Sequence, residues 1–149
     1  MNNKINKFIC LFLALGLILI TITISILLAN HEISTIEYFF ETKALKKENY
    51  SASIETLKQI ADDKNISLVT RNAAVVKALE IVSISSLEVK IEATLQAASY
   101  KYVICNIDTK IVRIILKPDF IFTRSKVEYI KKTVTDLTSI KNAELTIKR

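Results

Sequence analysis

The chain has 149 residues, of which 21 are basic and 15 acidic, and its formal net charge is +6. Its one glycine, Gly16, and one histidine, His31, both lie in or beside an apolar N-terminal segment. The rest of the chain therefore lacks the glycine-rich loops that bind nucleotide phosphates and the His-containing pairs that activate a nucleophile. We expect a protein that is not an enzyme.

The first predicted element is an uncharged apolar segment of 22 residues, Phe8 to Ala29. A helix of this length crosses a hydrocarbon core of about 30 Å. A cleavable signal peptide is the alternative, but its apolar region is usually about 7–15 residues long and small residues precede the cut, where this chain has Leu27. Basic residues precede the segment and acidic residues follow it, which predicts a cytoplasmic tail at residues 1–7 and an extracytoplasmic remainder.

Residues 30–84 are expected to form a helical stalk, because apolar residues recur at spacings of three and four. We expect a break near residues 46–51 and an end or turn at residues 62–65. A second helical stretch follows, whose apolar stripe is formed by Val69, Ala73, Val76, Leu79 and Val82. This stripe should pack on the stalk, on the folded part of the chain, or on another protein.

Residues 85–149 are predicted to form a small α+β domain. Ser85 with Glu88, and Ser125 with Glu128, have the spacing of a capping box, so each pair predicts the start of a helix. Strands are predicted at residues 102–105 and 110–117, with Pro118 ending the second, and alternation at residues 143–148 predicts a third. The order helix, strand, strand, helix, strand indicates a three-stranded sheet with both helices on one face.

The hairpin of the first two strands is predicted to turn through a four-residue loop, Asn106–Thr109, because a two-residue primed turn favours glycine. This register places Val103, Val112, Ile114 and Leu116 on the core face. The opposite face then carries an apolar strip, in which we expect a cation–π pair between Tyr102 and Arg113. We expect this strip to be a protein interface: Tyr102, Ile104, Ile111, Arg113 and Ile115. The alternative is that the stalk covers it, because monomers rarely leave large apolar patches exposed.

Charge is distributed unevenly along the chain. Residues 32–100 hold 8 basic and 10 acidic residues, whereas residues 101–149 hold 11 basic and 5 acidic residues. The C-terminal third therefore predicts a basic patch: Lys101, Lys110, Lys117, Arg124, Lys126, Lys131 and Lys132. Such a patch suits an anionic polymer such as cell wall or DNA, which would make the chain a binding module with steep salt dependence. It is equally consistent with a solubilising surface, and we do not expect a nucleic-acid partner.

No cofactor or metal site is predicted. Asp62 and Asp63 are the nearest approach to a group of metal ligands, but they are more typical of a helix end. Glu88 and Glu92 lie four residues apart on a predicted helix, and we expect them on an ordinary solvent-exposed face. Cys105 is expected to be a small buried residue, and with Cys10 in the predicted span no internal disulfide is available.

Four segments between Leu87 and Lys148 together resemble the ring-building motif of the stage III sporulation protein AH family. The members of this family are single-span membrane proteins of endospore-forming bacteria. These segments are LQAASYKYVI, NIDTKIVRIILK, RSKVEYIKKTVTDLT and AELTIK. The single anchor and the charged helical stalk also match the family's layout. Where the family often has a glycine near the end of the first helix and a Gly-Asp turn in the hairpin, this chain has Ala98-Ser99 and Ile107-Asp108.

The resemblance implies a non-catalytic protein of the mother-cell membrane that projects into the intermembrane space during engulfment. There it would bind a forespore-membrane protein similar to stage II sporulation protein Q and join a ring-like channel complex. Other ring-building-motif subunits, or further copies of this chain, would be its neighbours. The implied organisation is a tail at 1–7, an anchor at 8–29, a stalk at 30–84 and a ring-building-motif-like domain at 85–149.

Overall fold

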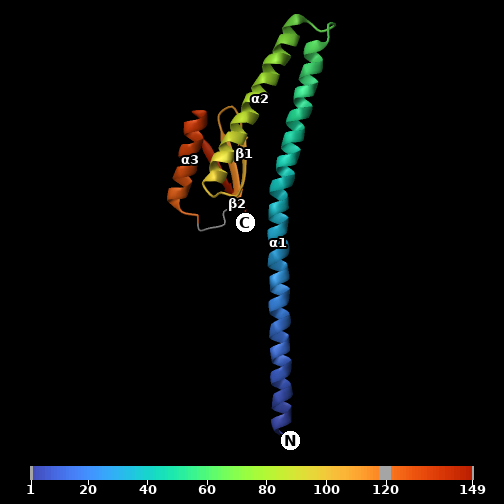
Figure 1. Ribbon diagram of the computed structural model, residues 1–149, viewed down its shortest axis with the longest axis vertical. Coiled ribbons are helices and arrows are strands. Elements are labelled where there is room, and N and C mark those ends of the chain that lie inside the picture. The colour runs from blue at the N-terminus through green and yellow to red at the C-terminus, as the bar shows by residue number, and fades with distance from the viewer. Residues whose placement is uncertain (1, 118–121, 149) are drawn as a thin grey trace. The chain divides into compact units, whose positions relative to one another are not determined.

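The computed structural model describes residues 2–117 and 122–148, and for residues 2–15 and 30–32 it describes only the backbone (Figure 1). Its elements are α1 (Asn2–Asp62), α2 (Leu68–Ala97), β1 (Tyr102–Ile107), β2 (Val112–Lys117), α3 (Arg124–Thr138) and β3 (Ala143–Ile147). The chain divides into two units, Met1–Glu37 and Tyr38–Arg149. The domain boundary expected before residue 85 therefore falls inside α2.

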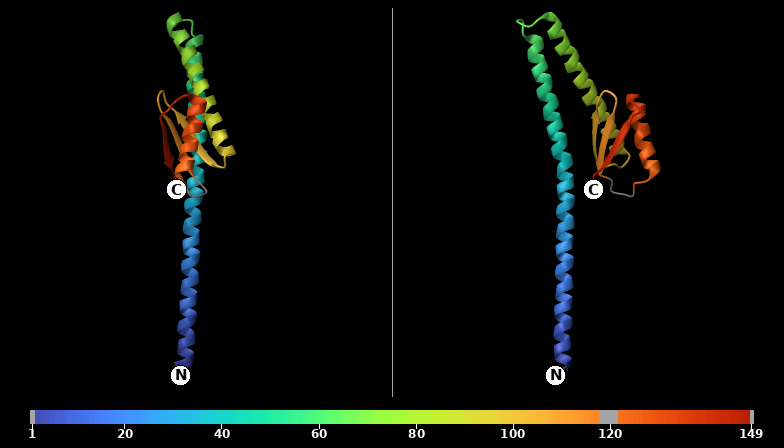
Figure 2. Two further views of the ribbon diagram at one scale, coloured as in Figure 1. Left: turned by 90° about the vertical axis from the view of Figure 1, so that its left-hand side faces the viewer. Right: turned by 180° about the vertical axis from the view of Figure 1, so that it is seen from behind.

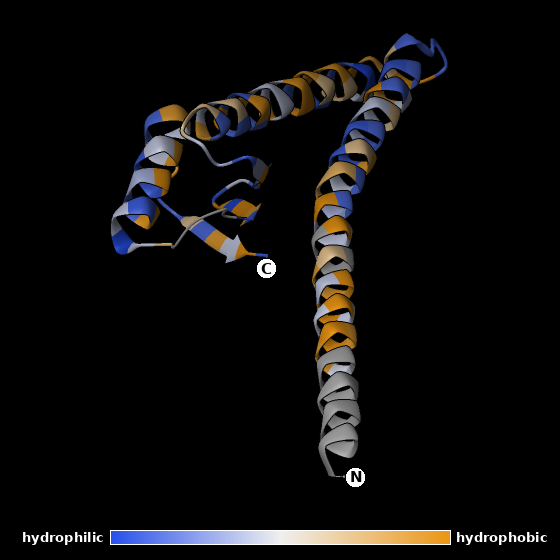
Figure 3. Cartoon of the chain, turned by 60° about the horizontal axis from the view of Figure 1, so that its bottom comes forward, coloured by the Kyte–Doolittle hydropathy of each residue, from blue (hydrophilic) through white to orange (hydrophobic). Residues whose placement is uncertain are grey.

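The first unit contains the apolar part of α1, where orange residues predominate in Figure 3. Large apolar side chains between Leu17 and Leu28 are exposed, and Leu27 is 68% exposed. Among the described residues, α1 is the one helix long and apolar enough to cross a membrane. The segment overlaps the predicted span at 8–29, although the side chains of residues 8–15 lie outside the described set.

Both long helices are more continuous than expected. Helix α1 runs through residues 46–51 without a break, and it ends at Asp62, within the expected turn region. Helix α2 begins after Ser67, whose hydroxyl accepts a hydrogen bond from the backbone N–H of Thr70 at 3.2 Å. The predicted start at Ser85 is wrong, because no glycine or proline separates the two apolar stretches and a single helix passes through them.

Helix α2 ends in a left-handed turn. The backbone N–H of Tyr100 bonds the carbonyl of Leu95 at 3.1 Å, and that of Ser99 bonds the carbonyl of Gln96 at 3.0 Å. Ser99 has φ 73°, so it occupies the position that glycine usually takes in a Schellman motif. The helix therefore stops before β1 in the usual way but with a less suitable residue.

The sheet has the order β1-β2-β3, with β1 antiparallel and β3 parallel to β2. Helices α2 and α3 lie on the same face (Figure 2). A core between them and the sheet is formed by Ile91, Leu95, Val103, Cys105, Val112, Ile114, Leu116, Ile130 and Val134. The predicted α+β fold is confirmed, including the core face of the hairpin.

The predicted pairing within the hairpin is wrong by four residues. A loop at Asn106–Thr109 places Val103 opposite Val112, whereas Val103 in fact faces Leu116. The turn lies two residues later than expected, because Asp108 and Ile111 exchange both backbone hydrogen bonds (2.9 and 3.4 Å) around Thr109 and Lys110. A four-residue shift is even, so every side chain keeps its predicted face.

The side chain of Asp108 stabilises this turn. Its Oδ1 accepts hydrogen bonds from the backbone N–H of Thr109 at 2.7 Å and from the Thr109 hydroxyl at 3.2 Å. The backbone bond is the main cause of a lowered pKa for Asp108. A short turn therefore forms without glycine or positive φ in the hairpin.

The second predicted capping box is also wrong. Helix α3 begins after Thr123, which makes no side-chain cap bond. Glu128 Oε1 instead accepts from Arg124 Nε at 3.1 Å. Pro118, expected to end the second strand, lies outside the described residues.

Candidate protein-interaction site

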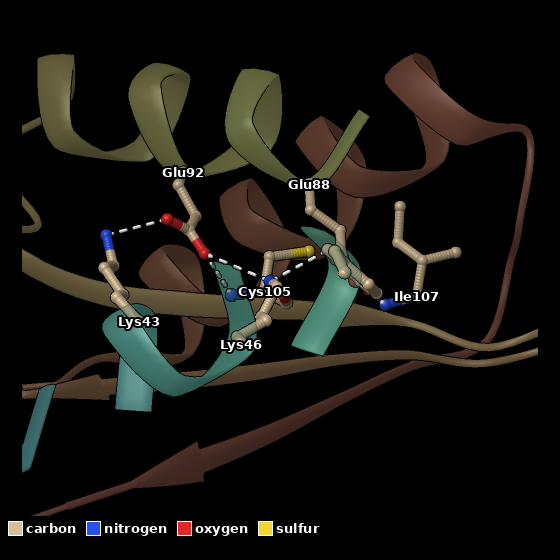
Figure 4. A network of polar contacts seen from close by, with 7 residues as sticks. Lys43, Lys46, Glu88, Glu92, Cys105 and Ile107 are labelled. Atoms are coloured by element: carbon tan, nitrogen blue, oxygen red, sulfur yellow. Dashed lines mark hydrogen bonds and ion pairs between the residues drawn. The ribbon is translucent and has the colours of Figure 1, made fainter. Parts of the chain in front are cut away.

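Strand β1 is an edge strand, and two glutamates of α2 bond its outer backbone groups (Figure 4). The N–H of Cys105 donates to Glu92 Oε1 at 2.9 Å, and the N–H of Ile107 donates to Glu88 Oε1 at 2.7 Å. Four helical residues rise about 6 Å and two strand residues about 6.6 Å, so side chains spaced i, i+4 match N–H groups spaced i, i+2. Helix α2 thus supplies acceptors that a neighbouring strand would otherwise supply.

Two lysines of α1 neutralise these glutamates. Lys43 Nζ lies 2.7 Å from Glu92 Oε2. Lys46 Nζ lies 2.8 Å from Glu88 Oε2 and 3.7 Å from Glu92 Oε1, and it also donates to the carbonyl oxygen of Cys105. Two positive and two negative groups therefore meet at the strand edge, which offsets the cost of burying the carboxylates.

Tyr50 of α1 completes the arrangement by donating its hydroxyl to Glu88 Oε2 at 3.0 Å. We call these five side chains the edge network: Lys43, Lys46, Tyr50, Glu88 and Glu92. Burial raises the pKa of Tyr50 to about 12, and the Glu88 charge and hydrogen bond act in the same direction. Tyr50 therefore remains a hydrogen-bond donor throughout the neutral range.

Cys105 lies beside the edge network but is chemically inert in this setting. Its side chain has no exposed surface. Burial raises the pKa of the Cys105 thiol to about 12, the Glu88 carboxylate adds to this effect, and Lys46 opposes it. Because the thiolate is the nucleophilic form, this protonated thiol is the small core residue that the sequence predicted.

The edge network closes β1 to other strands. An exposed edge strand is a template for pairing with another chain. Here the outward N–H groups of Cys105 and Ile107 and the carbonyl of Cys105 are already bonded by side chains of the same molecule. An added strand would have to displace Glu88, which is 1% exposed.

The sequence prediction for these glutamates is therefore wrong. Glu88 and Glu92 are buried, whereas they were expected on a solvent-exposed face. Their i, i+4 spacing ahead of a predicted edge strand was the available signal. A matching signal is the recurrence of Lys43, Lys46 and Tyr50 on one face of α1 at spacings of three and four.

The predicted apolar strip is partly covered. Ile104 is fully buried and Tyr102 half-buried, while the Phe39 ring of α1 packs 5.9 Å from the Tyr102 ring and is itself 2% exposed. The amino group of Lys148, the residue that follows β3, lies 3.7 Å from the centre of the Tyr38 ring. The α1 segment that follows residue 37 thus lies against this sheet face.

The rest of the strip keeps exposed surface. The side chain of Arg113 is 51% exposed and pairs with Glu144 at 3.4 Å. Ile115 is half-buried, and Ile111 belongs to the turn instead of the strand. The expected Tyr102–Arg113 cation–π pair is wrong, because Arg113 faces Asn106 in the actual register.

The predicted basic patch is dispersed along the domain. Lys101 and Lys117 meet at the Tyr102 ring, with their amino groups 5.2 and 5.9 Å from its centre. Lys110 lies in the turn at the other end of the hairpin. Arg124, Lys126, Lys131 and Lys132 lie on α3, where Arg124 pairs with Glu128. The structure therefore brings together Lys101 and Lys117 but leaves Lys110 apart from them.

The described part of the chain was also compared with the arrangements that bind metal ions. Within it, no group of three or more His, Cys, Asp or Glu side chains has the arrangement of a metal site. A cavity of about 430 Å³ is lined by Lys43, Lys46, Lys47, Tyr50, Ser51, Ile54, Ser85, Val89 and Glu92. Three of its polar residues already belong to ion pairs of the edge network.

Comparisons with known proteins agree with the fold. A family model described as SpoIIIAH-like protein matches residues 27–147. A chain in a solved structure described as the SpoIIQ-SpoIIIAH pore forming complex is 21% identical, with a TM-score of 0.63, over 73% of this chain and 96% of that chain. A search of curated proteins gives no match. The resemblance drawn from the sequence is confirmed.

Proposed function

Because this chain belongs to the SpoIIIAH-like protein family, we propose that it is a non-catalytic assembly subunit of a sporulation channel or ring complex. It acts by protein–protein interaction in the space between the mother-cell and forespore membranes. The observation that carries the proposal is the extent of the family match. Residues 27–147 include all of α2, α3 and the three strands.

The exposed apolar part of α1 supports an anchor in the mother-cell membrane. Its large side chains from Leu17 to Leu28 have no partner that would bury them among the described residues. A bilayer would bury these side chains, and the basic residues Lys4 and Lys7 would stay in the cytoplasm. Residues 30–149 then lie in the intermembrane space.

A SpoIIQ-like protein of the forespore membrane is the proposed partner. The matched solved chain comes from a complex that joins SpoIIQ and SpoIIIAH. Since the edge network closes β1, we propose contact through the uncovered half of the strip: Ile111, Arg113 and Ile115. Arg113 there offers a half-exposed guanidinium between two apolar side chains, a combination common in interfaces.

The test is capture of the soluble part of the SpoIIQ-like protein by the full-length chain in detergent. Arg113→Glu and Ile115→Glu should each weaken capture by about tenfold or more, as expected for central interface residues. Lys131→Glu makes the same charge change on α3 and should leave capture unchanged. Failure of the unmodified chain to capture the partner would reject the proposed pairing.

The same capture experiment distinguishes a specific SpoIIQ-like interface from the alternative function, a binding module for an anionic polymer. An equal loss of binding for Arg113→Glu and Lys131→Glu, with steep weakening in added salt, would indicate general charge attraction. Unchanged capture by both Arg113→Glu and Ile115→Glu would remove this surface from the proposal.

A further inference from the structure

Helix α2 carries an exposed apolar stripe that neither the core nor the edge network uses. Its large members are between 46% and 64% exposed: Leu68, Val75, Leu79, Val82 and Val89. Val69 and Val76, beside the stripe, are 79% and 66% exposed. The residues of α2 that are buried are different ones: Ala74, Glu88, Ile91, Glu92 and Leu95. The stripe is therefore apolar surface of α2 that its buried face does not include.

The spacing of the stripe indicates that its occupant is another helix. Together with the exposed polar residues Asn72 and Ser86, its members recur at alternating intervals of four and three from Leu68 to Val89. This is a repeat of 3.5 residues over three heptads, the period that keeps one face of a helix against a partner helix. We call these seven residues the α2 seam: Leu68, Asn72, Val75, Leu79, Val82, Ser86 and Val89.

Charge and polarity within the α2 seam fit a second copy of the same surface. The seam contains no charged residue, so two identical seams meet without repulsion. Lys77 and Glu80, on the same stretch of α2, form an ion pair with each other at 2.8 Å.

We propose that the α2 seam packs against the α2 seam of a second copy of this chain in a parallel, in-register pair. The parallel direction is part of this proposal, which rests on the anchoring of both copies in the same membrane proposed above. In such a pair each seam residue meets its own counterpart. Asn72 then meets Asn72 of the second copy, where each amide is both donor and acceptor, an arrangement that fixes register in parallel coiled coils.

Disulfide crosslinking of the full-length chain in membranes tests this pairing. Cys10 is replaced by alanine, and the buried Cys105 is kept. Val75→Cys, Val82→Cys and Val89→Cys should each form disulfide-linked dimers at least about tenfold more than Lys77→Cys, because a disulfide needs its two Cα atoms within about 7 Å. Lys77 is the matched control, since it is exposed on the opposite side of the same helix.

A second variant separates self-association from binding of the SpoIIQ-like protein. Adding Leu79→Glu should abolish the crosslinks at Val75→Cys and Val82→Cys, whereas adding Glu80→Gln should not. Capture of the SpoIIQ-like protein should be unaffected by either change. Crosslinks with no capture would contradict the proposed partner alone, and capture with no crosslinks would contradict the seam pairing alone.

Three other results would overturn the inference. Equal crosslinking at Lys77→Cys would show random collision. Crosslinking at Leu79→Cys without crosslinking at Val89→Cys would show an antiparallel pair. If the cysteine variants without Leu79→Glu form no seam crosslinks and Leu79→Glu abolishes capture of the SpoIIQ-like protein, the stripe binds the SpoIIQ-like protein instead of a second copy.

Discussion

Glu88 joins three other residues at the β1 edge. It accepts from the backbone of Ile107, accepts from Tyr50 and pairs with Lys46. It is 1% exposed, so its charge is acceptable only while these partners are in place. One residue therefore joins α1, α2 and β1.

Glu88→Ala should lower the free energy of unfolding by about 3–5 kcal/mol, because Lys46 loses its 2.8 Å ion pair and keeps only the 3.7 Å ion pair with Glu92, while the Ile107 N–H loses its acceptor. Denaturant unfolding of the full-length chain in detergent measures this loss. The control is Glu80→Ala, which removes a glutamate of the same helix whose ion pair with Lys77 is exposed. Its effect should be within about 0.5 kcal/mol. Similar losses for the two variants would contradict the importance given to the edge network.

The end of α2 shows how a single position limits a whole element. Ser99 holds φ 73° at the helix terminus, a conformation that costs a residue with a Cβ about 1–2 kcal/mol. Glycine adopts this conformation without that cost. The turn that leads into β1 therefore contains a residue, Ser99, that disfavours the left-handed conformation which the turn requires.

Ser99→Gly should raise the free energy of unfolding by about 0.5–1 kcal/mol, the strain relieved less the entropy that glycine loses on folding. Ser83→Gly is the matched control, since Ser83 is exposed inside the same helix. There the same change should lower stability by about 0.5 kcal/mol. A destabilising effect at both positions, measured by thermal unfolding, would show that Ser99 is not strained.

At the level of helices and strands, the sequence predicted the structure correctly where the periodicity of apolar residues determines which side chains face the core. Alternation along the hairpin predicted which residues face the core, and a shift of four residues in pairing left that assignment intact. Helix starts were not predictable from Ser85 and Ser125, because a capping box is one local option and the continuous apolar pattern of α2 outweighs it. The turn was misplaced because Asn106 favours turns, while Asp108 makes the actual turn bonds.

The candidate site was less accessible to sequence reasoning than the fold. The edge network joins Lys43 and Lys46 to glutamates far along the chain, and periodicity within one helix does not specify which helix lies opposite. The apolar strip left two occupants open, another protein or the stalk. Phe39 packs on the β1 part of that strip, whereas Arg113 remains exposed.

At the scale of the whole molecule, the second unit has both covered and exposed surfaces. The edge of β1 and the adjoining sheet face are occupied by side chains of α1 and α2. The Arg113 half of the strip and the α2 seam, by contrast, keep exposed surface. We assign the first to a partner in the facing membrane and the second to a copy in the same membrane.

We propose that this chain joins two membranes by binding a SpoIIQ-like protein. The most direct measurement is tethering of two vesicle populations, one carrying the full-length chain and the other the SpoIIQ-like protein, followed by light scattering. We expect the two populations to aggregate together, and an excess of the soluble part of the SpoIIQ-like protein to prevent this aggregation. Vesicles that remain separate although both proteins are correctly oriented would contradict the claim.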